Sequence, residues 1–357
     1  MIWLAWRQFR TASYVVAGFL VALGVAYFVT GPHLAHVYDT VVKTCAARGD
    51  CNSVETTFLS DDTFLRHFGN VLLLFPALLG MFWGAPLVAR EMESGTFRLA
   101  WTQSVTRQRW FLTRVALMVV ATVVATGLFS LMVTWWSSPF DTLDAALFSN
   151  FDVRDVAPVG YAIFAVLLGV CVGVVIRRTV FAMGTTLVAF AVVRLSISHW
   201  VRHYFASPLH LTTAFQLPFA TSNRSVKLGG GLKPGDWIVS DNIVNPQRRV
   251  IGHGGGFGPN GNVGFQAIGN GRTEFVGVGV CPNKIPASTG VARRDGPGAA
   301  VQHALNTCVA HFHLREVLTY FPSSRYWSFQ WYEFSLYFGM AIVLGAVALW
   351  WVRARMT

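Results

Sequence analysis

Residues 90–114 read REMESGTFRLAWTQSVTRQRWFLTR, a polar and basic segment between two long apolar runs. Residues 68–89 before it and residues 115–140 after it contain no charged side chain. A helix of about 20 apolar residues is long enough to cross the ~30 Å hydrocarbon layer of a membrane. The segment is therefore predicted to be a loop between two membrane spans.

The composition of the whole chain also indicates a membrane protein. Of its 357 residues, 53% are hydrophobic and 13% are charged, and the mean hydropathy is +0.46. Soluble domains usually carry about 25% charged residues. The formal net charge of +11 does not indicate a nucleic-acid partner. Many of the arginines lie at the ends of apolar runs, where the positive-inside rule and anionic lipids account for them.

The pattern of apolar runs predicts an all-α polytopic membrane protein with six transmembrane helices. The predicted spans are residues 14–29, 68–89, 115–140, 156–176, 179–201 and 334–352. Residues 1–10 are amphipathic and predict an interfacial helix before an uncleaved first span, with a signal peptide as the competing interpretation. The second span includes Pro76, Gly80, Gly84 and Pro86, so it is predicted to be kinked or broken.

The large region between the fifth and sixth spans predicts a separate domain. Residues 202–325 contain no span, are rich in Gly, Pro and Asn, and include short β-favouring runs such as 236–239 and 273–280. Short loops on the side of the termini carry mostly Arg, and those on the other side mostly acids, so both termini are predicted to be cytoplasmic. The predicted organisation is residues 1–201 with the interfacial helix and five spans, an extracellular domain at 202–325, and the sixth span with a cytoplasmic tail at 326–357.

The cysteines agree with this topology. Cys45 and Cys51 fall in the first outer loop, Cys281 and Cys308 fall in the predicted extracellular domain, and Cys171 falls within the fourth span. Two pairs on one side of the membrane suit disulfides in an oxidising exterior. Proximity favours Cys45–Cys51 and Cys281–Cys308, and four free thiols are the alternative.

Two charged residues are predicted to lie within or near the membrane. Arg194 follows Thr179 by about 22 Å of helix, and Glu333 begins the last span near the same level. A charge at this depth is costly unless it is paired or faces a wet cavity. We expect Arg194 to face the bundle interior and to pair with Glu333 or with an acid of an outer loop. The alternative is that Arg194 snorkels to the outer interface.

Motifs for catalysis or metal binding are weak in this sequence. The glycine-rich stretch 252–261 lacks the Gly-Lys-Ser/Thr ending of a phosphate loop, and His199 and His203 lack an acidic partner at metal-site spacing. The sequence also contains no Walker A motif and no Gly-x-Ser-x-Gly elbow. We therefore predict no catalytic residue, no metal site and no cofactor bound by this chain itself.

The loop of residues 90–114 has a pattern of its own. Phe97, Trp101 and Val105 recur at helical spacing, while charged residues gather at the two ends of the loop. This predicts a helix lying on the membrane surface or against a partner, with an ordinary basic loop as the alternative.

The same loop resembles the signature of type 2 ABC-transporter permeases. The resemblance is carried by Arg90-Glu91-Met92-Glu93-Ser94-Gly95-Thr96, followed by Leu99, Thr102, Val105, Thr106 and Arg107. The chain is also similar to a subgroup of actinobacterial permeases at residues 3–8, 75–86 and 320–333. In that family the loop forms a coupling helix that sits in a groove of the cytosolic ATPase subunit.

The resemblance implies that the chain is the permease subunit of an exporter in a bacterial plasma membrane. Its implied partners are a cytosolic ABC ATPase, which would hold ATP and Mg²⁺, a second permease copy, and membrane lipids. The implied coupling residues are Glu91, Glu93, Gly95, Thr96, Phe97, Arg98, Leu99, Trp101 and Arg107. The implied cargo is amphipathic or hydrophobic, such as a drug, lipid or peptide. The alternative function is a non-transporting membrane sensor or a membrane-anchored enzyme that uses the extracellular domain.

Overall fold

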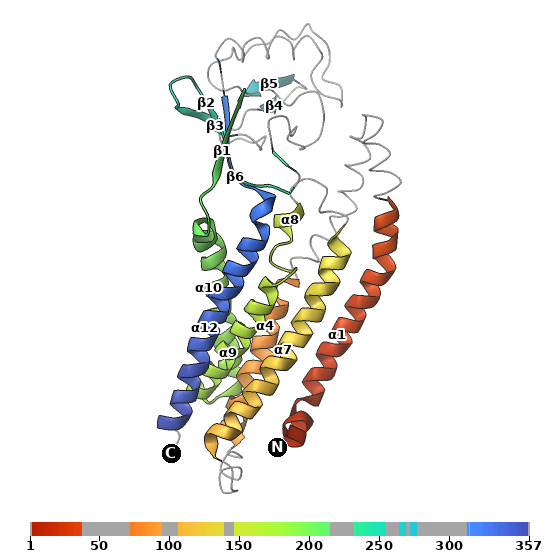
Figure 1. Ribbon diagram of the computed structural model, residues 1–357, viewed down its shortest axis with the longest axis vertical. Coiled ribbons are helices and arrows are strands. Elements are labelled where there is room, and N and C mark those ends of the chain that lie inside the picture. The colour runs from red at the N-terminus through yellow and green to blue at the C-terminus, as the bar shows by residue number, and fades with distance from the viewer. Residues whose placement is uncertain are drawn as a thin grey trace.

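The computed structural model describes residues 2–37, 72–94, 106–138, 146–214, 232–233, 235–253, 264–268, 272–276, 313 and 315–355. Long helices run side by side, and a small β-sheet lies at one end of them (Figure 1). Helix α1 (Ile2–Val37) starts, and helix α12 (Tyr326–Ala354) ends, at the opposite end of the bundle. We call the two ends of the bundle the sheet end and the termini end.

Five helices within the described residues are long and apolar enough to cross a membrane. Besides α1 and α12 they are α7 (Arg107–Ser137), α9 (Ala157–Ile176) and α10 (Thr179–Ser196). Helix α10 continues through a π-helical turn (Ile197–Val201) and a 3₁₀ turn (Arg202–Tyr204). Two short helical elements lie at the sheet end: α8 (Ala146–Ser149) and a 3₁₀ turn (Ser323–Arg325) before α12.

The region predicted to form the second span is helical but not uniformly α-helical. It consists of α4 (Phe75–Leu79), the π-helix η2 (Gly80–Gly84) and α5 (Ala85–Ser94). The backbone N–H of Ala85 donates to the carbonyl of Gly80, five residues earlier. Pro86 follows directly and has no N–H to donate, so a local change of helix type accommodates it without ending the helix. The predicted irregularity therefore lies at η2.

Helix α9 is the centre of the bundle. In its most apolar stretch 67% of the residues are buried, whereas this share is 17–33% in the four other candidate spans. Glycines lie on both sides of the contact between η2 and α9. Gly80 and Gly84 of η2 face the backbone of Ala165 and Val166, and Gly169 of α9 faces the backbone of Gly80 and Gly84. A Cβ atom at Gly80 would lie 2.5 Å from the carbonyl oxygen of Ala165, and one at Gly173 would lie 2.6 Å from that of Ala85. Small residues at this spacing let the two helix backbones touch, as is typical of membrane helices.

The sheet end carries an antiparallel sheet with strand order β1-β6-β2-β3. Its strands are β1 (Leu209–Ala214), β2 (Trp237–Val244), β3 (Val250–His253) and β6 (Arg315–Phe321). Strands β4 (Gly264–Ile268) and β5 (Arg272–Val276) form a separate antiparallel pair. The strands β2 and β5 include parts of the two runs that the sequence predicts to be β-favouring. Because β6 leads through a single 3₁₀ turn into α12, the sheet is joined closely to the bundle.

Three helix boundaries differ from the sequence predictions. Helix α7 begins at Arg107 rather than at Val115. The predicted interfacial helix at residues 1–10 and the first span form one continuous helix, α1, because no glycine or proline separates them. The last helix begins at Tyr326 rather than near Phe334. The charge of Glu333 predicts a later start, but in the structure Glu333 is a buried residue of α12 that pairs with Arg194 of α10.

Candidate functional site

Four charged side chains meet near the sheet end of the bundle, and we call them the charge cluster: Asp152, Arg194, Arg202 and Glu333. The Nη1 atom of Arg194 lies 2.7 Å from Oε1 of Glu333, and its Nη2 atom lies 2.6 Å from Oδ1 of Asp152. Arg202 forms ion pairs with the same two acids. The cluster is therefore formally neutral, with two cations facing two anions. It joins the loop before α9, the end of α10 and the first half of α12.

Glu333 is the centre of this cluster and is fully buried. Its Oε1 atom accepts hydrogen bonds from the hydroxyl of Tyr161 at 2.8 Å and from both arginines. Its Oε2 atom accepts from Nε of Arg202 at 2.9 Å, so Arg202 binds the carboxylate through two nitrogens. Charge-assisted bonds of this bidentate kind are among the strongest that side chains form.

A π-helical turn brings the two arginines to the same side of α10. In a regular α-helix, residues eight positions apart point about 80° away from each other. The π turn at Ile197–Val201 lies between Arg194 and Arg202 and adds one residue to the helical turn. The extra residue rotates the following side chains back by about 100° around the helix axis. Both guanidinium groups therefore reach Glu333.

Aromatic rings cover the charge cluster. The guanidinium carbon of Arg194 lies 4.0 Å from the ring centroid of Tyr161, and that of Arg202 lies 4.6 Å from the ring of Phe151. Burial by itself would raise the pKa of Asp152, but the nearby charges of Arg194 and Arg202 outweigh burial and lower it. Asp152 therefore stays ionised and keeps both arginines paired.

A second polar network fixes the loop before α9. The side-chain carbonyl of Gln330 accepts from the backbone N–H of Ala157 at 2.8 Å, and its amide nitrogen donates to the carbonyl of Phe151 at 3.1 Å. Asp155 accepts a hydrogen bond from the hydroxyl of Tyr326 and has a positive φ of 63°. The carbonyl of Asp155 accepts from the hydroxyl of Ser130 at 2.6 Å. These contacts attach the loop to both α7 and α12.

Two acids at the termini end connect α5 to other helices. Glu91 forms an ion pair with Arg114 of α7. Glu93 accepts hydrogen bonds from the hydroxyl of Thr179 at 2.7 Å and from its backbone N–H at 3.0 Å. Glu93 therefore caps the first turn of α10 from outside that helix, and these hydrogen bonds lower the pKa of its carboxyl group.

The structure describes only some of the site residues that the sequence predicts. It brings Arg194 and Glu333 together, and Arg194 also binds Asp152, the acid of an outer loop that was the other predicted partner. Glu91 and Glu93 contact internal partners, and Arg107 begins α7 after the capping residue Thr106. The remaining predicted residues lie outside the described residues: Gly95, Thr96, Phe97, Arg98, Leu99, Trp101, Cys45, Cys51, Cys281 and Cys308.

Arg202, Tyr161 and Gln330 also belong to these polar networks, although no sequence motif predicted them. Arg202 lies at the end of an apolar run, where a surface position is the usual expectation. The available signal was the spacing of Gln330, Glu333 and Tyr337 on one helix, three and four residues apart, which places their side chains on one face.

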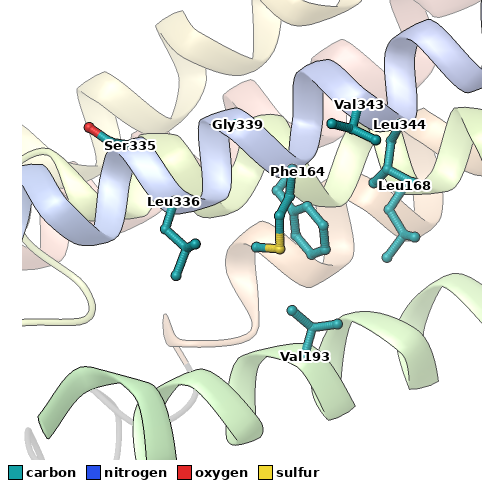
Figure 2. A pocket seen from close by; sticks show the side chains of 9 residues that line it. Phe164, Leu168, Val193, Ser335, Leu336, Gly339, Val343 and Leu344 are labelled. Carbon is teal, nitrogen blue, oxygen red and sulfur yellow. The ribbon is translucent and has the colours of Figure 1, made fainter. Parts of the chain in front are cut away.

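An apolar groove of about 590 Å³ lies between α9, α10 and α12. Its walls include Phe164 and Leu168 of α9, Val193 of α10 and Met340 of α12, and Ser335 is its one residue with a polar side chain. In Figure 2, Val193 points from α10 towards Phe164. The groove begins next to the charge cluster, because Val193 precedes Arg194 and Ser335 follows Glu333 by two residues.

Comparison with known families identifies the class of protein. A family described as "ABC-2 membrane transporter related" matches residues 17–202, slightly more than half of the chain. The chain belongs to this family and is a type 2 ABC-transporter permease, a multi-pass membrane protein. The match ends at Arg202, so the β-sheet and α12 lie beyond it. Searches of curated proteins and of solved structures found no match.

Proposed function

We propose that this chain is the transmembrane permease subunit of an ABC exporter in a bacterial plasma membrane. ATP and Mg²⁺ bind to a separate cytosolic ATPase subunit, and this chain delivers the resulting motion to the membrane spans. The observation that carries the proposal, besides family membership, is the set of contacts at the termini end. They attach both flanks of the loop at residues 95–105 to neighbouring helices.

These contacts suit the transmission of force. The loop joins the end of α5 to the start of α7, and the Glu91–Arg114 ion pair links the same two helices directly. Through Glu93, the end of α5 also holds the first turn of α10. A displacement of the loop would therefore move α5, α7 and α10 together rather than one helix alone. In this proposal Phe97, Leu99 and Trp101 contact the ATPase, while Glu91 and Glu93 act within the chain.

The proposed topology places the termini end in the cytoplasm and the sheet end outside the cell. The predicted second span, residues 68–89, then supplies the sixth crossing, in addition to the five candidate helices. Two copies of the chain assemble, and the transport pathway lies between them, lined by the second span and α10. The predicted disulfides Cys45–Cys51 and Cys281–Cys308 belong to the extracellular side. The apolar and aromatic character of the spans favours an amphipathic or hydrophobic cargo.

Co-purification tests this proposal. The full chain with a C-terminal tag is purified in mild detergent from its native cell, as the wild type and as the variant Trp101→Ala. A matched control is Trp350→Ala, because Trp350 is more than half exposed on α12 at the same end of the bundle. We expect an ABC ATPase to co-purify with the wild type and the control and to be lost from Trp101→Ala.

Two outcomes would contradict the proposal in different ways. If no ATPase co-purifies with the wild type, the chain does not act as an ABC permease, and a membrane sensor or membrane-anchored enzyme becomes the better hypothesis. If the ATPase is retained by Trp101→Ala, the coupling role of the loop is wrong, although the permease assignment stands.

A further inference from the structure

The groove between α9, α10 and α12 has a definite length along α12. Its lining residues on α12 run from Ser335 to Leu344, which is about 14 Å of helix at 1.5 Å per residue. This is about half of the ~30 Å hydrocarbon layer, the thickness that one leaflet contributes. Along α12 the groove is therefore about as long as one leaflet is thick.

Aromatic side chains mark where this leaflet meets water. Trp327, Trp331 and Tyr332 are more than half exposed on the first two turns of α12, and so are Trp200 and Tyr204 at the end of α10. Exposed Trp and Tyr residues of this kind are typical of the membrane interface, where lipid headgroups lie. The lining of the groove on α12 begins at Ser335, four residues after Trp331 of this aromatic belt, and continues from there towards the termini end.

From this position we propose that the groove is a binding site for one acyl chain of a phospholipid in the leaflet at the sheet end. The glycerol and headgroup lie at the aromatic belt, and the chain runs along the groove towards the membrane centre. This proposal requires that the chain spans the membrane, but it does not require that it transports anything.

The chemistry of the lining argues against water and against an empty groove. Ser335 is the one polar side chain in the lining, so water would find too few hydrogen-bond partners there. An empty groove would forfeit dispersion contacts along its walls. Its volume of about 590 Å³ is within the ~300–1,000 Å³ that ligand pockets commonly have. A hydrocarbon chain supplies the missing contacts without a polar partner.

One glycine keeps the groove open. Gly339 lies in the wall formed by α12, and a Cβ atom added there would meet no other atom within 4 Å. A larger side chain at this position can therefore enter the groove without a clash with the backbone. The variant Gly339→Phe fills the groove with protein atoms, and a matched control is Ile342→Phe. Ile342 is more than half exposed on the same helix and does not line the groove.

The charge cluster next to the groove indicates whether the site distinguishes lipids by the charge of their headgroups. Its two arginines are already paired with Asp152 and Glu333, so they offer no uncompensated charge to a lipid phosphate. We therefore expect the acyl chain, rather than the charge of the headgroup, to determine binding.

Photo-crosslinking tests the proposal on the full-length protein. The protein is reconstituted into phosphatidylcholine vesicles that contain a trace of phosphatidylcholine with a diazirine in the middle of one acyl chain. After illumination, labelled peptides are located by mass spectrometry. We expect labelling to concentrate on Phe164, Val193 and Met340. Gly339→Phe should reduce the labelling of these residues about tenfold, because roughly two methylene groups of the acyl chain would no longer be buried in the groove. Ile342→Phe should leave the labelling unchanged. A phosphatidylglycerol probe should label the same residues equally.

Two results would overturn the proposal. Labelling that is no stronger in the groove than on exposed residues of α7, such as Val120 and Leu128, and that is insensitive to Gly339→Phe, would mean ordinary surrounding lipid. An absence of groove labelling together with a disulfide between two Met340→Cys copies would mean that a second copy covers the groove. Failure of the ATPase co-purification would leave the labelling result untouched, so the two proposals fail separately.

Discussion

At the scale of single residues, Glu333 determines the polar architecture of the sheet end. A carboxylate with no exposure in the membrane region costs several kcal/mol unless cations and hydrogen-bond donors compensate it. Here Tyr161, Arg194 and Arg202 all donate to it. These donors come from α9, from α10 and from the turn that follows α10. One side chain therefore fixes how three helices meet.

Neutralising this carboxylate should be strongly destabilising. Glu333→Gln keeps the size of the side chain but leaves Arg194 and Arg202 facing the single charge of Asp152. We expect a loss of about 3–5 kcal/mol, the usual cost of breaking a buried ion pair, measured as a lower Tm of the detergent-solubilised protein. Ser328→Ala, at an exposed position of the same helix, is the control. A Tm equal to that of the control would refute the role of the charge cluster.

Exchanging the charges of Arg194 and Glu333 should not restore stability, because Arg202 depends on the same carboxylate. The combination of Arg194→Gln with Asp152→Asn removes one cation and one anion and keeps the cluster neutral. We expect this double variant to lose less stability than the sum of its two single variants. Simple additivity would show that the two side chains are not coupled.

At the scale of secondary structure elements, close contact between the second-span region and α9 depends on glycine. Four glycines, two from η2 and two from α9, leave no space for a side chain between the backbones. The π-helical turns have a related role, because each one changes which residues face the neighbouring helix. The turn at Gly80–Gly84 accommodates Pro86, and the turn at Ile197–Val201 aligns the two arginines.

A single methyl group should disrupt the glycine contact. At Gly169 a Cβ atom would lie 2.5 Å from the carbonyl oxygen of Gly80, so Gly169→Ala forces the two helices apart. We expect a loss of about 1–3 kcal/mol, as for other overpacked cores, measured by thermal unfolding in detergent. The control is Gly127→Ala on α7, where an added Cβ atom meets no other atom within 4 Å. Equal Tm values for the two variants would contradict close backbone contact.

At the scale of the whole molecule, polar contacts lie at the two ends of the bundle and apolar packing lies between them. The termini end has the contacts of Glu91 and Glu93, together with a hydrogen bond of 3.1 Å from Arg353 of α12 to Gln108 of α7. The sheet end has the charge cluster and the loop before α9. Beyond it, Glu316 of β6 shares a hydrogen bond with Asp241 of the neighbouring strand β2. Burial and the nearby carboxylate raise the pKa of Glu316 to about 7.

This pair of acids should make the stability of the sheet depend on pH. The folded protein binds the proton of Glu316 more tightly than the unfolded chain does, because the unfolded value is near 4.5. Its stabilising contribution is therefore complete below about pH 4.5 and is lost as the pH rises towards 7. We expect the wild-type Tm to fall by more than that of Glu316→Gln between pH 5 and pH 8. Parallel curves for the two proteins would contradict the shared proton.

Much of the helical arrangement can be predicted from the sequence. The boundaries of α9 and the start of α10 follow from apolar runs, the Arg177-Arg178 pair and an acidic loop, because a membrane span must satisfy its own backbone and bury no unpaired charge. The pairing of Arg194 with an acid could also be predicted, because an isolated arginine at that depth is too costly. The sequence could not indicate that Arg202 joins the same site, since its position depends on a π-helical turn.

The sequence by itself therefore determined that this chain is a polytopic membrane protein and where most of its candidate spans lie. These properties depend on transfer of side chains and backbone from water to hydrocarbon, which is nearly independent of neighbouring helices. Only the tertiary structure decided which acid binds which arginine, that α9 is the central helix, and that a groove remains beside it. Those features depend on contacts between residues far apart in the chain, such as Tyr161 with Glu333 and Gly80 with Gly169, and short-range sequence patterns carry little information about them.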